Sequence, residues 1–299
     1  LNALGTGSNV NVGNTTVTDN SGVGIEVTGS EGSITFASVD IDSVIDAGVR
    51  AIANNTTAFN VNGGTIDGVI GDGDGISVVN TTGLEIRNVQ IGQTNVVVGR
   101  GINIENTDGT AMDALVRDVT VTSNLDALRV IKSGTTNLNL NVGESTFEST
   151  SFAGMNIDGT AGTGTLFVTR FDDITVNGTA GGQGGIRVDT ATFDSSAGGG
   201  TAVNGGDLNV GTAGTRVRQT GVSLANTSGE LLFGSANIFT NEGIALSIDS
   251  SASVFNLAAV NGGEINSDGA VDADAIVLID VDNFTLNNTT VTNAAGFNT

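Results

Sequence analysis

The sequence predicts an all-β fold, a single-stranded parallel β-helix (β-solenoid) with three short strands per coil. Two recurring sequence units and an unusual composition support this prediction. The 299 residues include 45 Gly and no Pro, and a chain without Pro can donate every backbone N–H to a ladder. We expect about ten or eleven coils and no caps, in a single β-solenoid domain over residues 1–299.

The first recurring unit consists of two short apolar alternations separated by two residues. Each half reads apolar-x-apolar, which is the period of a strand with one buried face. We expect the two-residue break to be a corner between two strands. Clear copies lie at 10–17, 34–41, 84–91 and 116–121, and looser copies at 166–176, 231–239 and 284–291.

The second recurring unit begins with Gly or Ala, continues as an alternating strand and ends in Asn or Asp. Its copies lie at 75–80, 101–106, 154–158, 185–189, 221–226 and 275–280. The first apolar residues at five successive positions of this unit are 26 or 27 residues apart, namely Val49, Ile76, Ile102, Leu128 and Met155. This spacing indicates that each coil carries one copy.

Together the two units describe one turn of a solenoid. Three strands fit into about 25 residues, and each strand pairs in parallel with its equivalent in the next coil. Ten or eleven coils at about 4.8 Å each make a rod about 50 Å long. The rival prediction, a doubly wound α/β fold, needs amphipathic helices between the strands. Only residues 41–55 resemble such a helix, and Gly48 interrupts it.

The composition excludes several classes of function. The chain has no Cys and no His, which excludes thiol chemistry, Ser-His-Asp triads and the usual zinc sites. Its formal net charge of −22 repels phosphates, so we expect no nucleic-acid partner. No run of the sequence approaches 18 apolar residues, so we also expect no membrane insertion.

Asn or Asp recurs at the end of the second unit, where the chain turns. Both residues tolerate left-handed backbone and hydrogen-bond their own loop. Stacked from coil to coil, their side chains are predicted to bond along the rod axis as a ladder that satisfies buried turn groups. The predicted members of this structural turn ladder are Asn54, Asn80, Asn106, Asp158, Asp189, Asn226 and Asp280.

The repeat pattern resembles that of the right-handed parallel β-helix proteins, which include pectin-degrading enzymes, phage tailspikes and bacterial adhesin passengers. The resemblance covers nearly the whole chain and implies the fold and its hand, whereas it specifies function poorly. The stretch "NTDG" at 106–109 matches the opening motif of polygalacturonase-like glycosidases. That likeness implies a catalytic role for Asp108.

The remaining parts of the glycosidase pattern are missing. The only Asp-Asp pair is Asp172-Asp173, two or three coils after Asp108, whereas an acid–base pair needs carboxyl groups about 5 to 9.5 Å apart. No His can supply the family's Gly-His-Gly, and "RVIK" at 129–132 precedes the Asp pair instead of following it. We therefore expect no enzymatic activity, with a polysaccharide-active hydrolase or lyase as an alternative.

Two acidic loops precede strands of the second unit. Asp72 and Asp74 lie in "GDGDG", and Asp272 and Asp274 lie in "VDADA". Carboxylates at alternate positions can surround a calcium ion together with backbone oxygens, but neither loop completes a calcium-binding signature. We expect solvated acidic loops and no cofactor, with calcium at these four residues as the alternative.

The two ends of the sequence resemble each other, because residues 9–23 align with residues 283–297 without gaps. Isolated solenoids usually carry caps that cover their outer strand edges, and neither end of this sequence reads as a cap. We hypothesise that the chain stacks end to end with copies of itself, or that it is one slice of a longer repetitive polypeptide.

These features predict an extracellular or cell-surface structural protein: a β-solenoid subunit or segment of a filament, fibre or adhesin stalk. An alternative is a glycan-binding adhesin that contacts glycans or a host surface through its insertion loops. The insertions lie at 67–75, 92–101, 211–221 and 266–275, and loops on a rigid scaffold commonly carry recognition.

Overall fold

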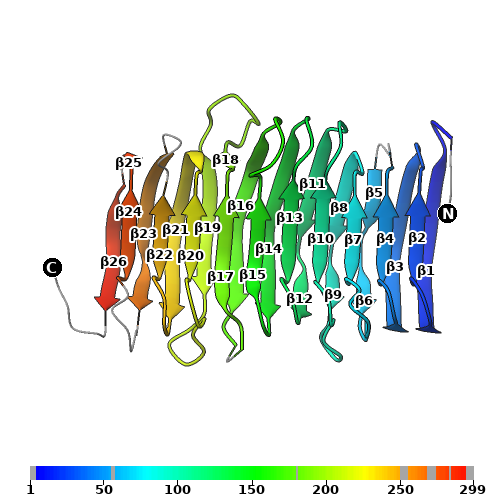
Figure 1. The fold of residues 1–299 in the computed structure, drawn as a ribbon, viewed down its shortest axis with the longest axis horizontal. Coiled ribbons are helices and arrows are strands. Elements are labelled where there is room, and N and C mark those ends of the chain that lie inside the picture. Colours follow the sequence, from blue (N-terminus) through cyan, green and yellow to red (C-terminus); the bar gives the residue numbers. More distant parts are fainter. Residues whose placement is uncertain are drawn as a thin grey trace.

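The computed structural model describes residues 5–54, 58–179, 181–249, 255–267, 274–282 and 284–293. All 26 elements are β-strands, and they stack in parallel along one axis as a β-solenoid (Figure 1). The predicted fold class is therefore confirmed. The helix of the rival α/β prediction is wrong, because the described part of 41–55 consists of strands and a turn. No helix in the described ranges is long and apolar enough to cross a membrane.

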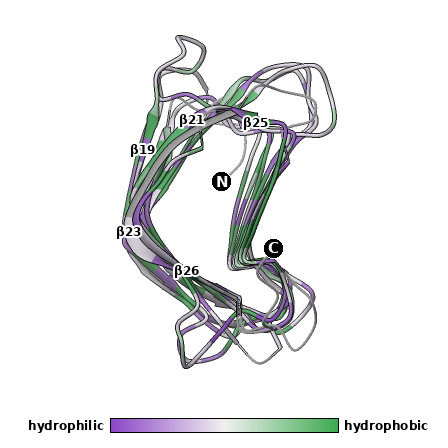
Figure 2. Cartoon of the chain, turned by 90° about the vertical axis from the view of Figure 1, so that its left-hand side faces the viewer, coloured by the Kyte–Doolittle hydropathy of each residue, from purple (hydrophilic) through white to green (hydrophobic). Residues whose placement is uncertain are grey.

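One strand of each coil belongs to a ten-stranded sheet, which we name the flat sheet. It forms the straight side of the cross-section in Figure 2. Ten strands correspond to ten coils, the lower of the two expected numbers. The strands are β2 (Ile25–Thr28), β4 (Val49–Ile52), β7 (Ile76–Val79), β10 (Ile102–Asn106), β13 (Leu128–Lys132), β15 (Ala153–Asp158), β17 (Gly184–Asp189), β20 (Val222–Ala225), β22 (Leu246–Asp249) and β24 (Ile276–Ile279).

The other strands form a 16-stranded sheet that curves around the opposite side (Figure 2), which we name the bent sheet. Its strands are β1 (Asn9–Asn20), β3 (Ser33–Val44), β5 (Ala58–Val61), β6 (Gly64–Ile66), β8 (Gly83–Arg87), β9 (Val89–Ile91), β11 (Met112–Arg117), β12 (Thr120–Ser123), β14 (Leu138–Ser149), β16 (Leu166–Asn177), β18 (Thr192–Phe193), β19 (Val203–Val210), β21 (Ser228–Thr240), β23 (Phe255–Ser267), β25 (Val281–Asp282) and β26 (Leu286–Asn293).

The two halves of the first sequence unit are continuous in some coils and separate in others. They run together as one strand of 12 or 13 residues in β1, β3, β14, β16, β21 and β23. Those coils therefore contain one long strand of the bent sheet and one strand of the flat sheet, instead of the expected three short strands. A single left-handed residue, such as Glu144 (φ 50°) or Asp173 (φ 52°), bends the strand while the pairing continues on both sides of it.

A column of Gly and Ala lies at the start of the strands of the flat sheet, and we name it the glycine column. Its members are Gly24, Gly48, Gly75, Gly101, Ala127, Gly154, Gly185, Gly221, Ala245 and Ala275. Space explains the small residues, since a Cβ on Gly101 would lie 2.0 Å from Cγ1 of Val121 on the bent sheet. The same Cβ would lie 2.6 Å from the Ala127 carbonyl oxygen in the next coil. The corner between the two sheets thus leaves little room for a side chain at Gly101.

The core consists of aliphatic side chains stacked on their equivalents from coil to coil. Ile76, Ile102 and Leu128 occupy one register position and are fully buried. Aromatic rings fill the wider part of the bent sheet, where the rings of Phe171 and Phe193 meet edge to face with centroids 6.0 Å apart. Parallel strands that stack like with like in this way keep their register, because a one-residue slip would turn the apolar side chains outward.

The single lysine of the chain lies inside this core. Lys132 has no exposed surface, and its Nζ donates a hydrogen bond to the carbonyl oxygen of Gly164 in the next coil. Burial lowers the pKa of the Lys132 amine below its ordinary value, because removal from water disfavours the charged form. The ammonium is therefore tied to the backbone of a neighbouring coil instead of facing solvent.

We expect Lys132 to resist amine-reactive acylation in the folded protein and to react readily in urea. A lowered pKa increases the fraction of neutral, reactive amine at a given pH, so protection would report inaccessibility and not protonation. The expected difference in acylation rate is on the order of 100-fold or more, because access requires opening of the core. Mass spectrometry of the peptide that contains Lys132 measures this difference, and equal rates in the two states would show that the amine is accessible.

Candidate functional site

The first candidate site lies where the bent sheet turns, at a left-handed residue that recurs in successive coils. Asn88, Asp118, Glu144 and Asp173 have φ values between 50° and 53°. The pairing of β12 with β14 and of β14 with β16 places Asp118, Glu144 and Asp173 one coil apart in a single column. Asn and Asp suit this conformation because their short polar side chains tolerate left-handed backbone. The sheet therefore gathers acidic groups at its bend.

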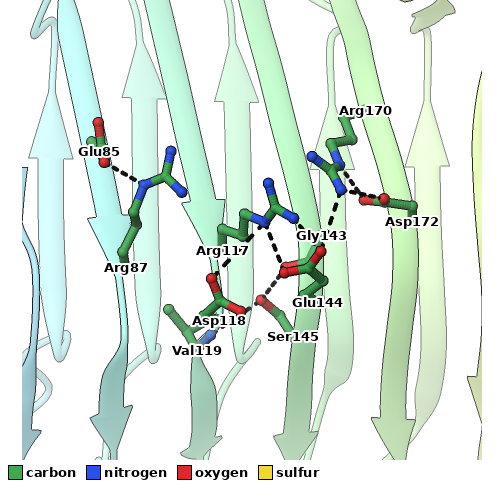
Figure 3. A network of polar contacts seen from close by, with 10 residues as sticks. All are labelled: Glu85, Arg87, Arg117, Asp118, Val119, Gly143, Glu144, Ser145, Arg170 and Asp172. Carbon is green, nitrogen blue, oxygen red and sulfur yellow. Dashed lines mark hydrogen bonds and ion pairs between the residues drawn. The ribbon is translucent and has the colours of Figure 1, made fainter.

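Two arginines neutralise this acidic column (Figure 3). Arg117 forms a two-pronged hydrogen-bonded ion pair with Glu144 and lies 3.9 Å from Asp118. Arg170 bonds Asp172 with nitrogen–oxygen distances of 2.5 and 2.6 Å, and it lies 3.4 Å from Glu144. The hydrogen bond from Arg117 lowers the pKa of Glu144 below its ordinary value. The network thus joins three coils through alternating charges.

Carboxylate oxygens of Glu144, Asp172 and Asp173 lie within 4.8 Å of one another, which makes them the converging acidic group among the described residues. Oxygen ligands at such separations are compatible with a divalent cation. Glu144 and Asp173 are nevertheless exposed and Asp172 is only partly buried, and Arg117 and Arg170 already bind two of the three carboxylates. Exposed ion pairs each contribute about 1 kcal/mol or less, so this network serves mainly to relieve repulsion within the column.

The converging group of Glu144, Asp172 and Asp173 could not be predicted from the spacing of the sequence repeat. Asp172-Asp173 stands out as the only Asp-Asp pair, but Glu144 precedes it by a coil that contains a register shift. The pairing of β14 with β16 skips a residue between Leu140 and Asn141. Because of this irregularity, counting by the repeat length does not bring Glu144 opposite Asp173. The two arginines of the network also differ in register, because Arg117 pairs with Gly143 whereas Arg170 pairs with Asn141.

Asp108 of the "NTDG" stretch lies elsewhere. It is in the loop after β10 at one edge of the flat sheet, and its Oδ1 accepts a hydrogen bond of 2.7 Å from the Thr110 N–H. Asp172 and Asp173 are at the bend of β16 on the bent sheet. The structure therefore does not bring Asp108 into the converging acidic group. Instead, Asp108 closes its own turn, as Asp commonly does two residues before the donor.

The acidic loop proposed for calcium forms a small hollow with two arginines. The hollow has a volume of about 420 Å³, and its lining includes Asp72, Asp74, Arg50 and Arg100. The backbone N–H of Arg100 donates a 2.9 Å hydrogen bond to Asp74, and its guanidinium lies 3.7 Å from the same carboxylate. Burial raises the pKa of Asp74 above its ordinary value, although these contacts oppose the rise. Arg100 thus lies directly beside Asp74.

The second acidic loop is less well covered by the structure. Asp272 lies outside the described residues, and Asp274 is exposed just before β24. Calcium at either loop remains a prediction.

The predicted turn-ladder residues lie at three neighbouring register positions of the flat sheet. Four of them share one register position, at the end of their strands. They are Asn80, Asn106, Asn226 and Asp280. Asn54 is one residue later, and Asp158 and Asp189 are one residue earlier. Lys132 occupies the position equivalent to Asn106 in the next coil. Sequence spacing alone did not resolve these one-residue offsets.

Some of these side chains do bond along the rod axis. Asn80 accepts a 2.7 Å hydrogen bond from the Thr107 N–H one coil later, and Asn226 donates to Asp189 over 3.2 Å. Asn54 is fully buried, and its Oδ1 accepts a 2.8 Å bond from the Ser30 N–H. These three amides therefore bond groups of an adjacent coil, whereas Asn106 donates to the Thr110 carbonyl oxygen in its own loop. The described amides thus do not form a single stacked column.

A buried carboxylate that the sequence did not single out organises the long insertion after β18. Asp194 accepts hydrogen bonds from the backbone N–H groups of Ser196, Gly198, Gly200 and Thr201 over 2.8 to 3.0 Å. Burial by itself raises the pKa of Asp194, but these bonds outweigh burial and hold the pKa well below its ordinary range. Four backbone donors and the Ser196 hydroxyl, which donates over 2.7 Å, converge on one carboxylate and fix a Gly-rich loop that its composition would leave flexible.

We expect Asp194 to make the loop sensitive to acid. Its pKa is lower in the folded than in the unfolded chain, so its stabilising contribution is fully present above pH of about 4 and is lost as pH falls through the folded value. Asp194→Asn is expected to flatten the loss of stability between pH 5 and pH 2 and to speed cleavage of the loop by protease. Urea midpoints measured at several pH values test this, and identical slopes for the two proteins would contradict it.

The second candidate site is a hollow on the outer face of the flat sheet, which we name the Phe152 hollow. It has a volume of about 300 Å³ and lies over β15, β17 and β20. Its floor consists of three outward-facing residues that share a register position, namely Asn156, Arg187 and Ser223. Phe152 and the loops that lead into β17 and β20 form its wall. One of these loops is the insertion 211–221.

Comparison of the chain with protein-family models, with curated proteins and with solved structures finds no match. The function must therefore be inferred from the geometry of the rod and of its two candidate sites.

Proposed function

We propose that this chain is an extracellular structural protein, a rod-like subunit of a filament, fibre or adhesin stalk that stacks end to end through its outermost coils. The observation that carries the proposal is the state of the outer strand edges. In the described ranges, β1 pairs only with β3 and β2 only with β4. At the opposite end, β26 pairs only with β23 and β24 only with β22. Unpaired edges of this kind accept a further strand.

The core is also partly open at the outermost coils. Leu278 and Val291 face inward from the last described coil, and they are 39% and 46% exposed. Their partners in the preceding coil, Ile248 and Ile265, are fully buried. Because apolar side chains are stabilised when removed from water, a further coil laid on this end would complete the core as it is completed everywhere else in the rod.

The first and last coils match each other in register. The ungapped alignment of 9–23 with 283–297 places Leu286 at the position of Val12 and Val291 at the position of Val17. Within the rod, Val12 and Val17 pair with Phe36 and Ile41 of the next coil. A second copy that places its β1 on β26 would therefore stack apolar on apolar without a register shift, which favours a copy of the same chain as the partner.

The sides of the rod favour the same role. The net charge of −22 makes rods repel one another sideways while the ends remain apolar and hydrogen-bonding. Continuous parallel ladders along the axis resist local opening, and such resistance suits a protein exposed to proteases outside the cell. We therefore place the chain outside the cell or at its surface.

End-to-end stacking is tested by negative-stain microscopy and light scattering at increasing protein concentration. We expect particles that are multiples of a rod about 50 Å long, the length of ten coils at about 4.8 Å each. Val291→Lys places a charge at the open end of the core and is expected to return the particles to single rods.

Ile70→Lys is the matched control, because Ile70 is also an exposed apolar residue, at 62%, but lies in an insertion on the side of the rod. This variant should keep the particle lengths of the unmodified chain. Short dispersed particles of the unmodified chain at high concentration would overturn the proposal. The gene from which the chain derives would show whether the next coil is joined covalently.

A further inference from the structure

The Phe152 hollow has an exposed aromatic ring at its side. Phe152 is 47% exposed, and it is the only aromatic among the exposed large hydrophobic side chains in the described part of the chain. The other rings for which burial is described lie inside the rod or partly covered on it. An exposed ring beside a hollow offers an apolar face to a ligand at no cost in folding, because the ring contributes little to the core.

Polar groups with unused hydrogen-bonding capacity surround this ring. The side-chain amides of Gln183 and Gln219 make no hydrogen bond within the described residues, and both residues are exposed at the rim. Oδ1 of Asn156 is buried and has no hydrogen-bond partner there, while its Nδ2 donates to Asp126 over 3.1 Å. A buried oxygen without a partner is unfavourable, so a ligand donor that reaches Oδ1 of Asn156 would be favoured.

The backbone holds these groups in place. Gln183 donates its N–H to the carbonyl oxygen of Phe152 over 3.0 Å, and Gln219 donates its N–H to the carbonyl oxygen of Gln183 over 2.8 Å. The three residues thus come from three successive coils in one ladder. Asp126 also accepts a 3.2 Å bond from the Ala153 N–H, which fixes the start of β15. Backbone hydrogen bonds between successive coils therefore fix the rim, including Gln219 at the end of the insertion 211–221.

Arg187 supplies the remaining donor. Its side chain is 59% exposed, and it lies 3.5 Å from Asp189 on the same strand. Planar amide and guanidinium groups next to an aromatic ring match a sugar, because the ring packs on the C–H face while the planar groups bond neighbouring hydroxyls. A polyanion fits poorly on a chain of charge −22, and a purely apolar ligand would leave the amides unpaired.

From this juxtaposition we propose that the Phe152 hollow is a binding subsite for a neutral hexose unit of an oligosaccharide. Phe152 stacks on the sugar ring, Gln183 and Gln219 bond its hydroxyls from the rim, and Asn156 and Arg187 bond it from the floor. The position on the side of the rod leaves both ends free. Binding is therefore independent of end-to-end stacking.

A second hollow on the same sheet provides an internal control. The floor of the hollow at Asp72 and Asp74 includes Arg50, which occupies the same outward register column of the flat sheet as Arg187. That hollow is lined by carboxylates and arginines and has no aromatic side chain. Both hollows lie on the flat sheet and have an arginine at the same register position. Only the Phe152 hollow has an aromatic ring and the side-chain amides of Gln183 and Gln219.

The test is titration calorimetry with neutral hexasaccharides of glucose, mannose and N-acetylglucosamine, together with saturation-transfer NMR. We expect at least one of them to bind, and we expect Phe152→Ala and Arg187→Ala each to weaken that binding at least tenfold. Arg50→Ala is expected to leave the affinity unchanged. Circular dichroism and particle length of all variants should match those of the unmodified chain.

Two results would overturn the proposal. One is the absence of binding to all three hexasaccharides at millimolar concentration. The other is binding that Arg50→Ala weakens as much as Arg187→Ala does, or that persists in Phe152→Ala. Either result would leave the evidence on stacking untouched, because particle length is measured separately.

Discussion

Gly101→Val is expected to lower the free energy of unfolding by about 3 kcal/mol or more. A Cβ at this position would lie 2.0 Å from Cγ1 of Val121 and 2.6 Å from the carbonyl oxygen of Ala127. The clash with Val121 can be relieved only if that buried side chain moves. The clash with the Ala127 carbonyl oxygen can be relieved only if the backbone of the next coil moves. A larger side chain at Gly101 would therefore push the two sheets apart at this corner.

Far-UV circular dichroism in urea measures this effect, since the chain has no Trp or Tyr to report by fluorescence. Gly109→Val is the matched control, because a Cβ at Gly109 meets only Thr135 Oγ1, at 3.6 Å. This control should unfold at nearly the same urea concentration as the unmodified chain. A Gly101→Val protein with an unchanged midpoint would show that the corner is not as narrow as the structure has it.

Phe147→Ala is expected to cost about 3–5 kcal/mol of unfolding free energy. Phe147 is fully buried in β14, where it pairs with Val121 in the preceding coil and Val176 in the following one. Truncation removes apolar surface that is buried in three successive coils and leaves a cavity that stacked strands cannot close. The loss should appear as a lower urea midpoint.

The control for this substitution is Phe152→Ala, which removes the same atoms from an exposed position. Because the Phe152 ring is 47% exposed, its loss should change the free energy of unfolding by well under the cost at Phe147, by about 1 kcal/mol or less. Similar losses for the two variants would contradict the burial pattern. A small loss of unfolding free energy in Phe152→Ala would also show that the variant used to test sugar binding is folded.

The two sequence units contain most of the information about the fold. Alternating apolar residues predicted the strands, and the Gly-or-Ala start of the second unit predicted to within one residue where β7, β10, β15, β17, β20 and β24 of the flat sheet begin. The glycine column follows from the same pattern, because the repeat places Gly101 in the same corner in which Gly75 lies one coil earlier. Strand merging was not predicted, since a left-handed residue such as Glu144 bends the backbone while pairing continues.

The candidate sites were less accessible to sequence reasoning. Asp72, Asp74 and Asp108 were singled out because their local motifs resemble known ligand or catalytic patterns, whereas the structure places the converging carboxylates at Glu144 and Asp172-Asp173. Local motifs describe neighbours along the chain. Converging side chains in a solenoid come from different coils, and insertions or register shifts of a single residue decide which of them meet.

By itself the sequence determined that the chain is a stack of parallel coils with an aliphatic core, because periodicity and residue size act within one coil and repeat in the next. Only the tertiary structure decided the register between coils. That register put Lys132 inside the core at the position where Asn106 lies in the coil before it, and it placed Phe152, Gln183 and Gln219 around one hollow. These arrangements depend on the varying length of each coil, which adds up along the rod and cannot be read from any single repeat.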